Sequence, residues 1–214
     1  MTKLARPILL QALDLRFAYP HQPALIDGWS IAIHAGVTLI HGDTGSGKST
    51  LLRVLAGAEP AAGWLTLASA HADTDLAAYQ RCVFWCDPAT EAFEQVTARD
   101  CTAALQDGDD RFDTAAWHEH VAGFALAPHL DKPMYMLSTG SKRKLWLAAA
   151  LASGRALTLL DEPSAALDAA SVAHLQQALA KLAETDQRAV VIASSQRLGT
   201  IPLAGLIELP LQGA

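Results

Sequence analysis

Apolar residues recur along this chain with two different periods, which together predict an alternation of strands and helices. Short apolar or alternating runs predict strands over residues 8–19, 29–33, 37–40, 64–68, 81–85, 156–160 and 189–193, with an edge strand at 206–209. Apolar spacings of three and four residues predict helices over 48–57, 97–106, 114–126, 139–152 and 169–183. Strands that alternate with helices predict an α/β fold with a mostly parallel sheet, preceded by a strand-rich N-terminal third.

A glycine-rich turn lies between the strand expected at 37–40 and the helix that follows it. Glycines let the backbone curl with its N–H groups pointing inward at the positive end of the helix, which suits a polyphosphate. The Lys48 amine can reach the β- and γ-phosphates, and the Ser49 hydroxyl can bind the Mg²⁺ that a nucleoside triphosphate carries. Such a turn can be only a turn, but the strand before it and the helix after it favour nucleotide binding. The residues expected to bind the nucleotide are Gly42, Asp43, Thr44, Gly45, Ser46, Gly47, Lys48, Ser49 and Thr50.

Two acidic residues, Asp161 and Glu162, follow the apolar run that ends at Leu160. Open α/β sheets bind their ligands at the carboxyl ends of the strands. Asp161 can therefore hold the metal through water, and Glu162 can polarise a water molecule for attack on the γ-phosphate. Two acids after a strand often form only a solvated turn, but four apolar residues and an upstream phosphate loop favour the catalytic interpretation.

A further segment, LSTGS at residues 137–141, comes directly before the lysines, leucines and alanines of the helix expected at 139–152. Ser138 or Ser141 would cap that helix, and its N-terminal amides would form a second anion site. Taken alone, this segment favours an ordinary capped helix.

Four motifs in this order resemble those of one family, the ATP-binding cassette (ABC) transporter ATPases. GDTGSGKST is similar to the family's phosphate loop, LSTGSKRK to its signature sequence, LTLLDEP to its metal-binding strand and SAALD to its loop that communicates across the dimer. The resemblance covers nearly the whole chain. It implies a P-loop NTPase core with N-terminal antiparallel strands, in one nucleotide-binding domain over residues 1–214, with an inserted helical subdomain at about 87–150.

The resemblance also implies cofactors and partners, namely ATP, Mg²⁺, a second ABC subunit and a membrane-spanning permease. Tyr19 would stack on adenine, and Ser138 and Gly140 would bind the γ-phosphate of ATP held mainly by the partner subunit. Two subunits, in a homodimer or a heterodimer, would then sandwich two nucleotides. The boundary of the helical subdomain would receive the permease, which would choose the substrate and hold the protein at the cytoplasmic face of the cell membrane.

Four positions depart from the family's usual pattern. Cys86 stands where the family usually has a glutamine that senses the metal and the permease, and Gln196 stands where a histidine contacts the γ-phosphate. A neutral amide can donate a hydrogen bond but cannot become a cation, so hydrolysis is expected to be slow. In the signature, Thr139 and Ser141 replace the commonest glycine and glutamine. The residues expected to act in catalysis are Glu162, Lys48 and Gln196.

Composition narrows the class of protein without changing this interpretation. A chain of 214 residues with 51% hydrophobic and 18% charged residues predicts one compact soluble domain. The net charge of −6 argues against a broad nucleic-acid-binding surface, so no nucleic acid partner is expected. Three cysteines are an odd number and favour thiols in a reducing compartment. The first apolar segment is too short for a signal peptide and no apolar run approaches the roughly 20 residues of a membrane span, so a cytosolic protein is expected unless a partner anchors it.

Two other functions are consistent with parts of the sequence. Soluble ABC ATPases that act on DNA or ribosomes share the phosphate loop, but typically carry long coiled coils or tandem cassettes, which this sequence lacks. A nucleotide-gated regulatory module that binds ATP and barely hydrolyses it is motivated by Cys86 and Gln196.

Two groups of polar residues have simpler expected roles. His118 and His120 fall on a helix expected to be exposed, and residues two apart do not share a helix face, so a metal site there is improbable. The basic run at 142–144 is expected to be a solvated helix face.

Overall fold

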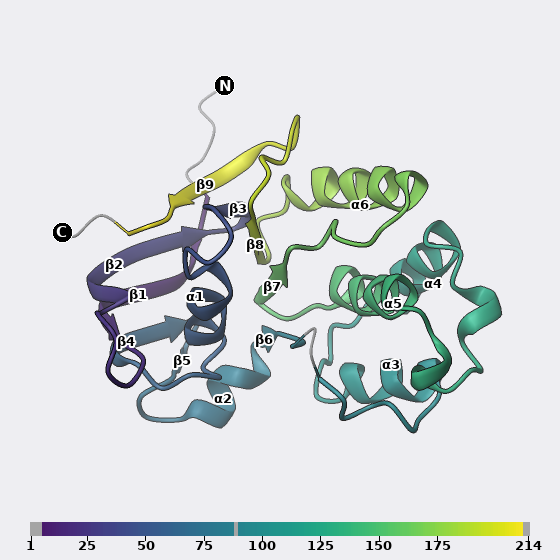
Figure 1. Ribbon diagram of the computed structural model, residues 1–214, viewed down its shortest axis with the longest axis horizontal. Helices are drawn as coiled ribbons and strands as arrows, with labels where there is room; N and C mark the ends of the chain where they lie inside the picture. The colour runs from purple at the N-terminus through teal and green to yellow at the C-terminus, as the bar shows by residue number, and fades with distance from the viewer. Residues whose placement is uncertain (1–5, 88–89, 212–214) are drawn as a thin grey trace.

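The computed structural model describes residues 6–87 and 90–211, and its strands form two sheets (Figure 1). The antiparallel sheet has the order β2-β1-β4-β5, and the second sheet has the order β6-β7-β8-β3-β9 with parallel pairing throughout. The antiparallel sheet contains β1 (Ile8–Phe17), β2 (Ile26–His34), β4 (Ala62–Leu67) and β5 (Ala70–His71). The parallel sheet contains β3 (Gly36–His41), β6 (Val83–Phe84), β7 (Leu157–Asp161), β8 (Ala189–Ser194) and β9 (Leu203–Glu208). The predicted α/β fold with a mostly parallel sheet is confirmed.

Six α-helices fall within the described residues, and most begin at a side-chain cap that the sequence provides. Thr97, Asp113, Ser138 and Asp168 each accept a hydrogen bond from the backbone N–H three residues later, which satisfies an otherwise free donor. The helices are α1 (Lys48–Leu55), α2 (Leu76–Arg81), α3 (Ala98–Gln106), α4 (Thr114–Gly123), α5 (Thr139–Ala152) and α6 (Ala169–Leu182), with short 3₁₀ turns at Ala127–His129 and Met134–Met136.

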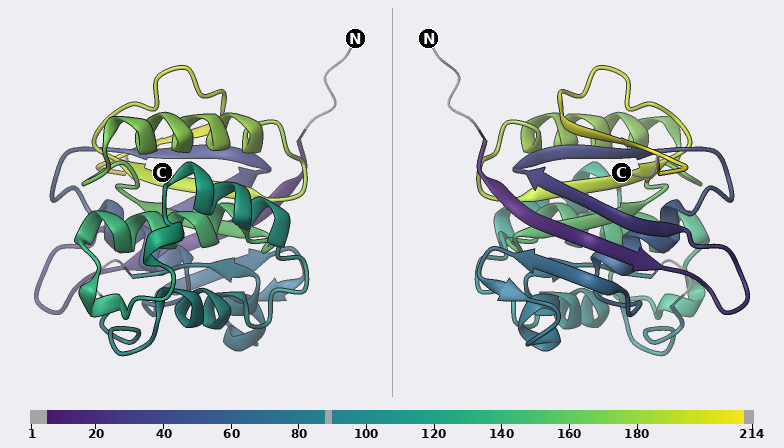
Figure 2. Two further views of the ribbon diagram at one scale, coloured as in Figure 1. Left: turned by 90° about the vertical axis from the view of Figure 1, so that its right-hand side faces the viewer. Right: turned by 90° about the vertical axis from the view of Figure 1, so that its left-hand side faces the viewer.

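The helices cover opposite faces of the parallel sheet (Figures 1 and 2). Helix α1 packs between the two sheets, where its Leu51, Leu52 and Leu55 join one apolar core with side chains of β1, β4, β7 and β8. Helices α3 to α6 contribute to a second core on the other face. The parallel strands serve both cores because successive side chains point to opposite faces: Leu159 faces α1 and Leu160 faces the second core.

The strand predicted over 81–85 is shorter than expected, and a short helix precedes it. Arg81 belongs to α2, and only Val83 and Phe84 pair with β7. Asp75 caps α2 by accepting from the backbone N–H of Ala78 at 2.9 Å. The helix has six residues, fewer than two turns, so its sequence is too short to display a helical period.

Helices α4 and α6 are joined by a pair of histidines, which corrects the expectation that the helix face around residue 120 is exposed. His120 is only 8% exposed, and its Nδ1 lies 3.1 Å from Nε2 of His174 on α6. The His174 ring meets Phe124 edge-on, with 4.7 Å between ring centroids. Burial, and then the charge of His174, lower the pKa of His120 to about 4, so this ring is neutral near pH 7.

Candidate functional site

The glycine-rich turn connects β3 to α1, and its last glycine begins the helix. Gly47 has φ +98°, a conformation that favours glycine, and a Cβ there would lie 2.5 Å from the Leu25 side chain. No side chain caps this end of α1. The first amides of the helix therefore remain available as donors, at the positive end of its dipole, for an anion such as phosphate.

Lys48 lies over this turn and faces the acids at the end of β7. The residue is buried, with 6% of its surface exposed, and Nζ donates to the carbonyl oxygens of Gly42 at 2.8 Å and Asp43 at 3.0 Å. The same nitrogen lies 3.4 Å from Oε1 of Glu162. The sequence placed these groups 114 positions apart in the chain, and the parallel sheet brings them together.

Glu162 is held by the neighbouring strand β8 through both its backbone and its side chain. Its N–H donates to the Ala193 carbonyl at 2.9 Å, and its φ of +41° is unusual for a residue with a side chain. Oε1 accepts from the Ser195 N–H at 2.8 Å, and Oε2 accepts from the Ser194 hydroxyl at 3.3 Å. The carboxylate therefore has a defined position between β8 and Lys48.

A cavity of about 680 Å³ opens where the phosphate loop, the end of β7 and the end of β8 meet. This volume is typical of small-molecule sites. Within the described chain, Oδ1 of Asp161 is buried without a hydrogen-bond partner, which leaves a carboxylate oxygen available for a cation. The predicted site residues that line the cavity are Thr44, Gly45, Gly47, Lys48, Ser49, Thr50, Asp161, Glu162 and Gln196.

Six predicted site residues lie outside the lining of this cavity, namely Tyr19, Gly42, Asp43, Ser46, Ser138 and Gly140. Tyr19 sits beside the first turn of α1, where its hydroxyl is 2.9 Å from the Thr50 hydroxyl. Ser138 caps α5 by accepting from the Ser141 N–H at 3.1 Å, and Gly140 lies in the first turn of the same helix. Within this one chain, Ser138 and Gly140 therefore do not line the cavity that Lys48 lines.

The sequence of this site matches a known family. Residues 26–165 match the family model described as ABC transporter. The chain belongs to the ABC transporter family.

Several curated proteins are similar to this ABC family member. The cytochrome c biogenesis ATP-binding export protein CcmA 1 of Cupriavidus metallidurans is 37% identical over 77% of this chain and 80% of its own length. A CcmA protein of Salmonella typhi is 31% identical over 94% and 93% of the two chains. The cobalt import ATP-binding protein CbiO of Rhodobacter capsulatus is 34% identical over 78% of this chain and 63% of its own length.

Solved structures of ABC proteins share the fold. A putative ABC transporter ATP-binding protein from Pyrococcus furiosus gives a TM-score of 0.74 at 19% identity, with 94% of this chain and 96% of that chain covered. A dimeric ATP-binding cassette in a post-hydrolysis state, bound to ADP and Pi, gives a TM-score of 0.71 at 19% identity, with 88% of each chain covered. Among the described residues of this ABC chain, no helix is long and apolar enough to cross a membrane.

The basic run at 142–144 is not a solvated face of α5, because each of its side chains binds a residue outside that helix. Nζ of Lys142 lies 2.5 Å from Glu94, and Nζ of Lys144 lies 2.5 Å from Asp168, the cap of α6. The hydrogen bond from Lys144 holds the pKa of Asp168 well below its usual range. Arg143 reaches the end of β7. The three side chains therefore link α5 to Glu94, to the end of β7 and to the cap of α6.

Two residues of the site in this ABC chain were missed by the sequence analysis, namely Ser194 and Ser195. They contact the Glu162 carboxylate directly, and the Ser194 hydroxyl also accepts from the Gln196 N–H at 3.0 Å. The available signal was their place immediately at the end of a buried strand, where the acids of β7 also stand.

Cys86, which the sequence analysis placed at the family's usual glutamine position, lies just beyond β6. Its thiol lines a small apolar pocket of about 40 Å³ between β7 and α5. Burial raises the pKa of Cys86 to about 12, so it is a neutral thiol near pH 7. A thiol is only a weak hydrogen-bond donor.

Proposed function

We propose that this chain is the ATP-binding and ATP-hydrolysing subunit of an ABC transporter, in which ATP-driven closure of a dimer is coupled to a membrane permease. The observation that carries the proposal is the convergence of Lys48, Ser49, Asp161 and Glu162 on one cavity, in a chain of this family. A cation, a hydroxyl, a metal-binding acid and a potential base are the groups that phosphoryl transfer from ATP requires.

Each group has a distinct role in the proposed reaction. Lys48 and the first amides of α1 bind the β- and γ-phosphates and stabilise the charge that develops on them. Glu162 accepts a hydrogen bond from the attacking water and orients it. Gln196 lines the same cavity and donates its amide toward the γ-phosphate. Tyr19 stacks on the adenine from its place beside α1.

The side chains present fit Mg²⁺ as the cofactor. Asp161 and Ser49 both line the cavity, and the unpartnered Oδ1 of Asp161 leaves an oxygen of the type that Mg²⁺ prefers. One carboxylate and one hydroxyl suffice, because Mg²⁺ in such sites keeps water and binds substrate phosphates. When bound, Mg²⁺ would neutralise charge on the β- and γ-phosphates.

The proposed partners account for the residues that lie outside the cavity. Ser138 and Gly140 would bind the γ-phosphate of ATP held mainly by a second ABC subunit. The segment at 87–150, which holds α3, α4 and most of α5, would form the helical subdomain of a single nucleotide-binding domain and would receive the permease. The permease would hold the protein at the cytoplasmic face of the cell membrane.

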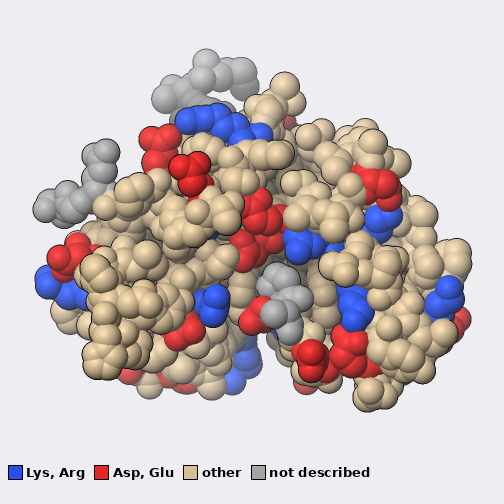
Figure 3. Space-filling model, in the orientation of Figure 1, with Lys and Arg blue, Asp and Glu red and all other residues tan. Residues whose placement is uncertain are grey.

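A regulatory module that binds ATP and hydrolyses it slowly is the second candidate. It is favoured by the neutral Cys86 thiol and by Gln196 at the place of a histidine. An ATPase acting on DNA is less well supported. Lysine and arginine side chains are interspersed with acidic ones on the face that Figure 3 shows, rather than forming one basic surface.

Phosphate release from Mg·ATP by the purified wild-type protein tests the proposed reaction. We expect steady release that stops when EDTA removes the metal and returns when excess Mg²⁺ is added, because the ion that Asp161 and Ser49 would hold neutralises charge on the phosphates. Manganese should substitute for magnesium. ATP binding without phosphate release, in the presence of Mg²⁺, would instead support the regulatory module.

Gln196→His is expected to raise kcat and to leave ATP affinity nearly unchanged. A histidine would supply a more rigid donor that can carry positive charge, and the difference between a charged and a neutral hydrogen bond corresponds to about tenfold in rate. Steady-state phosphate release gives the measurement. Ser195→His is the matched variant one position earlier in the same cavity. A rise in Ser195→His alone would assign the role to position 195, and no rise in either would mean that the site is adapted to an amide.

A further inference from the structure

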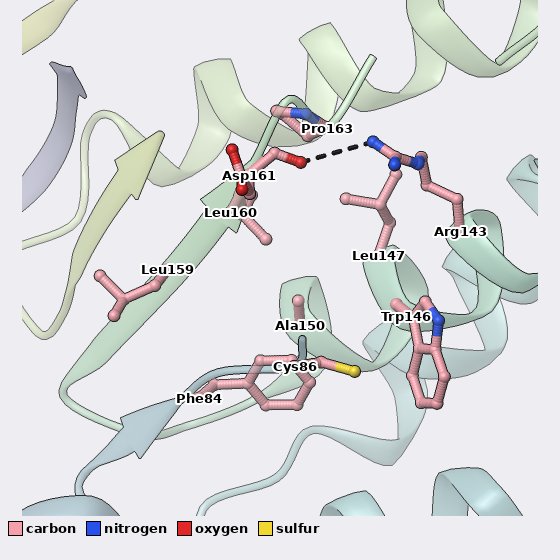
Figure 4. A pocket seen from close by; sticks show the side chains of 10 residues that line it. All are labelled: Phe84, Cys86, Arg143, Trp146, Leu147, Ala150, Leu159, Leu160, Asp161 and Pro163. Atoms are coloured by element: carbon pink, nitrogen blue, oxygen red, sulfur yellow. Dashed lines mark hydrogen bonds between the residues drawn. The ribbon is translucent and has the colours of Figure 1, made fainter. Parts of the chain in front are cut away.

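Arg143 on α5 reaches across to the end of β7 and binds the backbone that carries the two acids. Its Nη1 donates to the carbonyl oxygen of Glu162 and lies 3.4 Å from that of Asp161. Figure 4 shows the guanidinium extended from α5 toward Asp161, above the apolar side chains of Leu147 and Leu160. The contact joins the helix that begins with the signature sequence to the strand that ends at the proposed base.

The backbone of Glu162 depends on contacts of this kind for its conformation. Its φ of +41° is a left-handed value that residues with a side chain rarely adopt, so the surrounding structure must hold it. The N–H is held by Ala193 at 2.9 Å, and the carbonyl accepts from the Ala165 N–H at 3.0 Å as well as from Arg143. The bond from Arg143 is charge-assisted and so the stronger of the two to this carbonyl.

The other end of this connection is the start of α5. Ser138 caps the helix, and Gly140 lies against the loop after β7, where a Cβ at Gly140 would be 2.7 Å from the Ala166 carbonyl. Arg143 follows Gly140 by three residues, about one helical turn, within a continuous helix of 14 residues. A displacement of the start of α5 must therefore move the guanidinium that holds Glu162.

We propose that Arg143 is a positioning residue that holds Glu162 in its working orientation and transmits the position of the α5 N-terminus to it. This inference rests on the proposed function, in which Glu162 orients the attacking water. In a dimer whose partner nucleotide contacts Ser138 and Gly140, closure would set Glu162 through Arg143.

Arg143→Met tests this role, with Arg143→Lys as the conservative variant. Methionine keeps much of the apolar stem but removes the donors, so Glu162 loses one of the bonds to its carbonyl. We expect kcat to fall about tenfold, the effect of one charged hydrogen bond, while KM and the Kd of a fluorescent ATP analogue stay within about twofold of wild type. Lysine supplies a single ammonium in place of the fork and should restore part of the lost kcat.

Arg99→Met is the matched control, since it makes the same substitution in an exposed ion pair between α3 and Asp131. It should keep the wild-type kcat. A wild-type kcat in Arg143→Met would overturn the inference, and so would a parallel loss of ATP affinity and melting temperature that lysine does not relieve, because that result describes packing alone. Absence of hydrolysis in the wild type would contradict the proposed function, whatever Arg143 does.

Discussion

Lys48→Ala is expected to lower the affinity for ATP by at least about 100-fold. The variant would lose two charge-assisted hydrogen bonds from the amine to the phosphates, of about 1.5–3 kcal/mol each. The amine already lies in the phosphate loop, where it is bound by the Gly42 and Asp43 carbonyls, so little rearrangement is needed for it to meet a phosphate. Backbone amides of the loop and of α1 remain in the variant and would still attract the anion weakly.

Titration with a fluorescent ATP analogue measures this affinity directly. Lys181→Ala is the matched control, because Lys181 forms an exposed ion pair with Glu119 on the surface of α4 and α6. Its ATP affinity should equal that of the wild type. Unchanged affinity in Lys48→Ala would remove the phosphate loop from the proposed site.

Glu162→Gln is expected to keep ATP binding and to lose turnover by about 100-fold or more, the size of effect that general-base contributions reach. Glutamine has nearly the same shape, and its Oε1 can still accept from the Ser195 N–H, which now lies 2.8 Å from the carboxylate. It cannot accept a proton from water, and it no longer forms an ion pair with Lys48, so the change does not weaken the binding of phosphate by the amine.

Two measurements separate binding from turnover in this variant. Phosphate release should be lost, and gel filtration with ATP should show an ATP-bound dimer that accumulates because hydrolysis no longer opens it. Glu119→Gln, at the other half of the control ion pair, should hydrolyse ATP at the wild-type rate. A Glu162→Gln protein that does so too would exclude Glu162 as the base.

Local sequence features were sufficient to predict most elements of the fold. The apolar run before Asp161 and the glycine-rich turn before α1 are short-range signals, and each forms the strand or turn that its composition favours. Helix α2 was missed because six residues do not show a period, and its main anchor is distant in sequence: the Tyr79 hydroxyl donates to the Leu55 carbonyl of α1 at 2.6 Å.

The candidate site was predictable as a set of residues but not as a set of contacts. Lys48 and Glu162 were both expected from their motifs, whereas the part played by Ser194 depends on the pairing of β7 with β8. Arg143 and His120 were taken for surface residues because a helix pattern of mixed polarity does not reveal which neighbour covers it. Contacts with elements distant in the sequence determine the surroundings of both side chains.

The alternation of side chains along the parallel strands has an evolutionary consequence. Val190 and Ile192 on β8 face the core shared with α4, α5 and α6, whereas Val191 and Ala193 face the core shared with α1 and the antiparallel sheet. Mutations can therefore accumulate on one side of the sheet without disturbing the other. Apart from the contact of Arg143 with the end of β7, the outer helices can diverge to suit a new binding partner, while the apolar residues that support the phosphate loop stay unchanged.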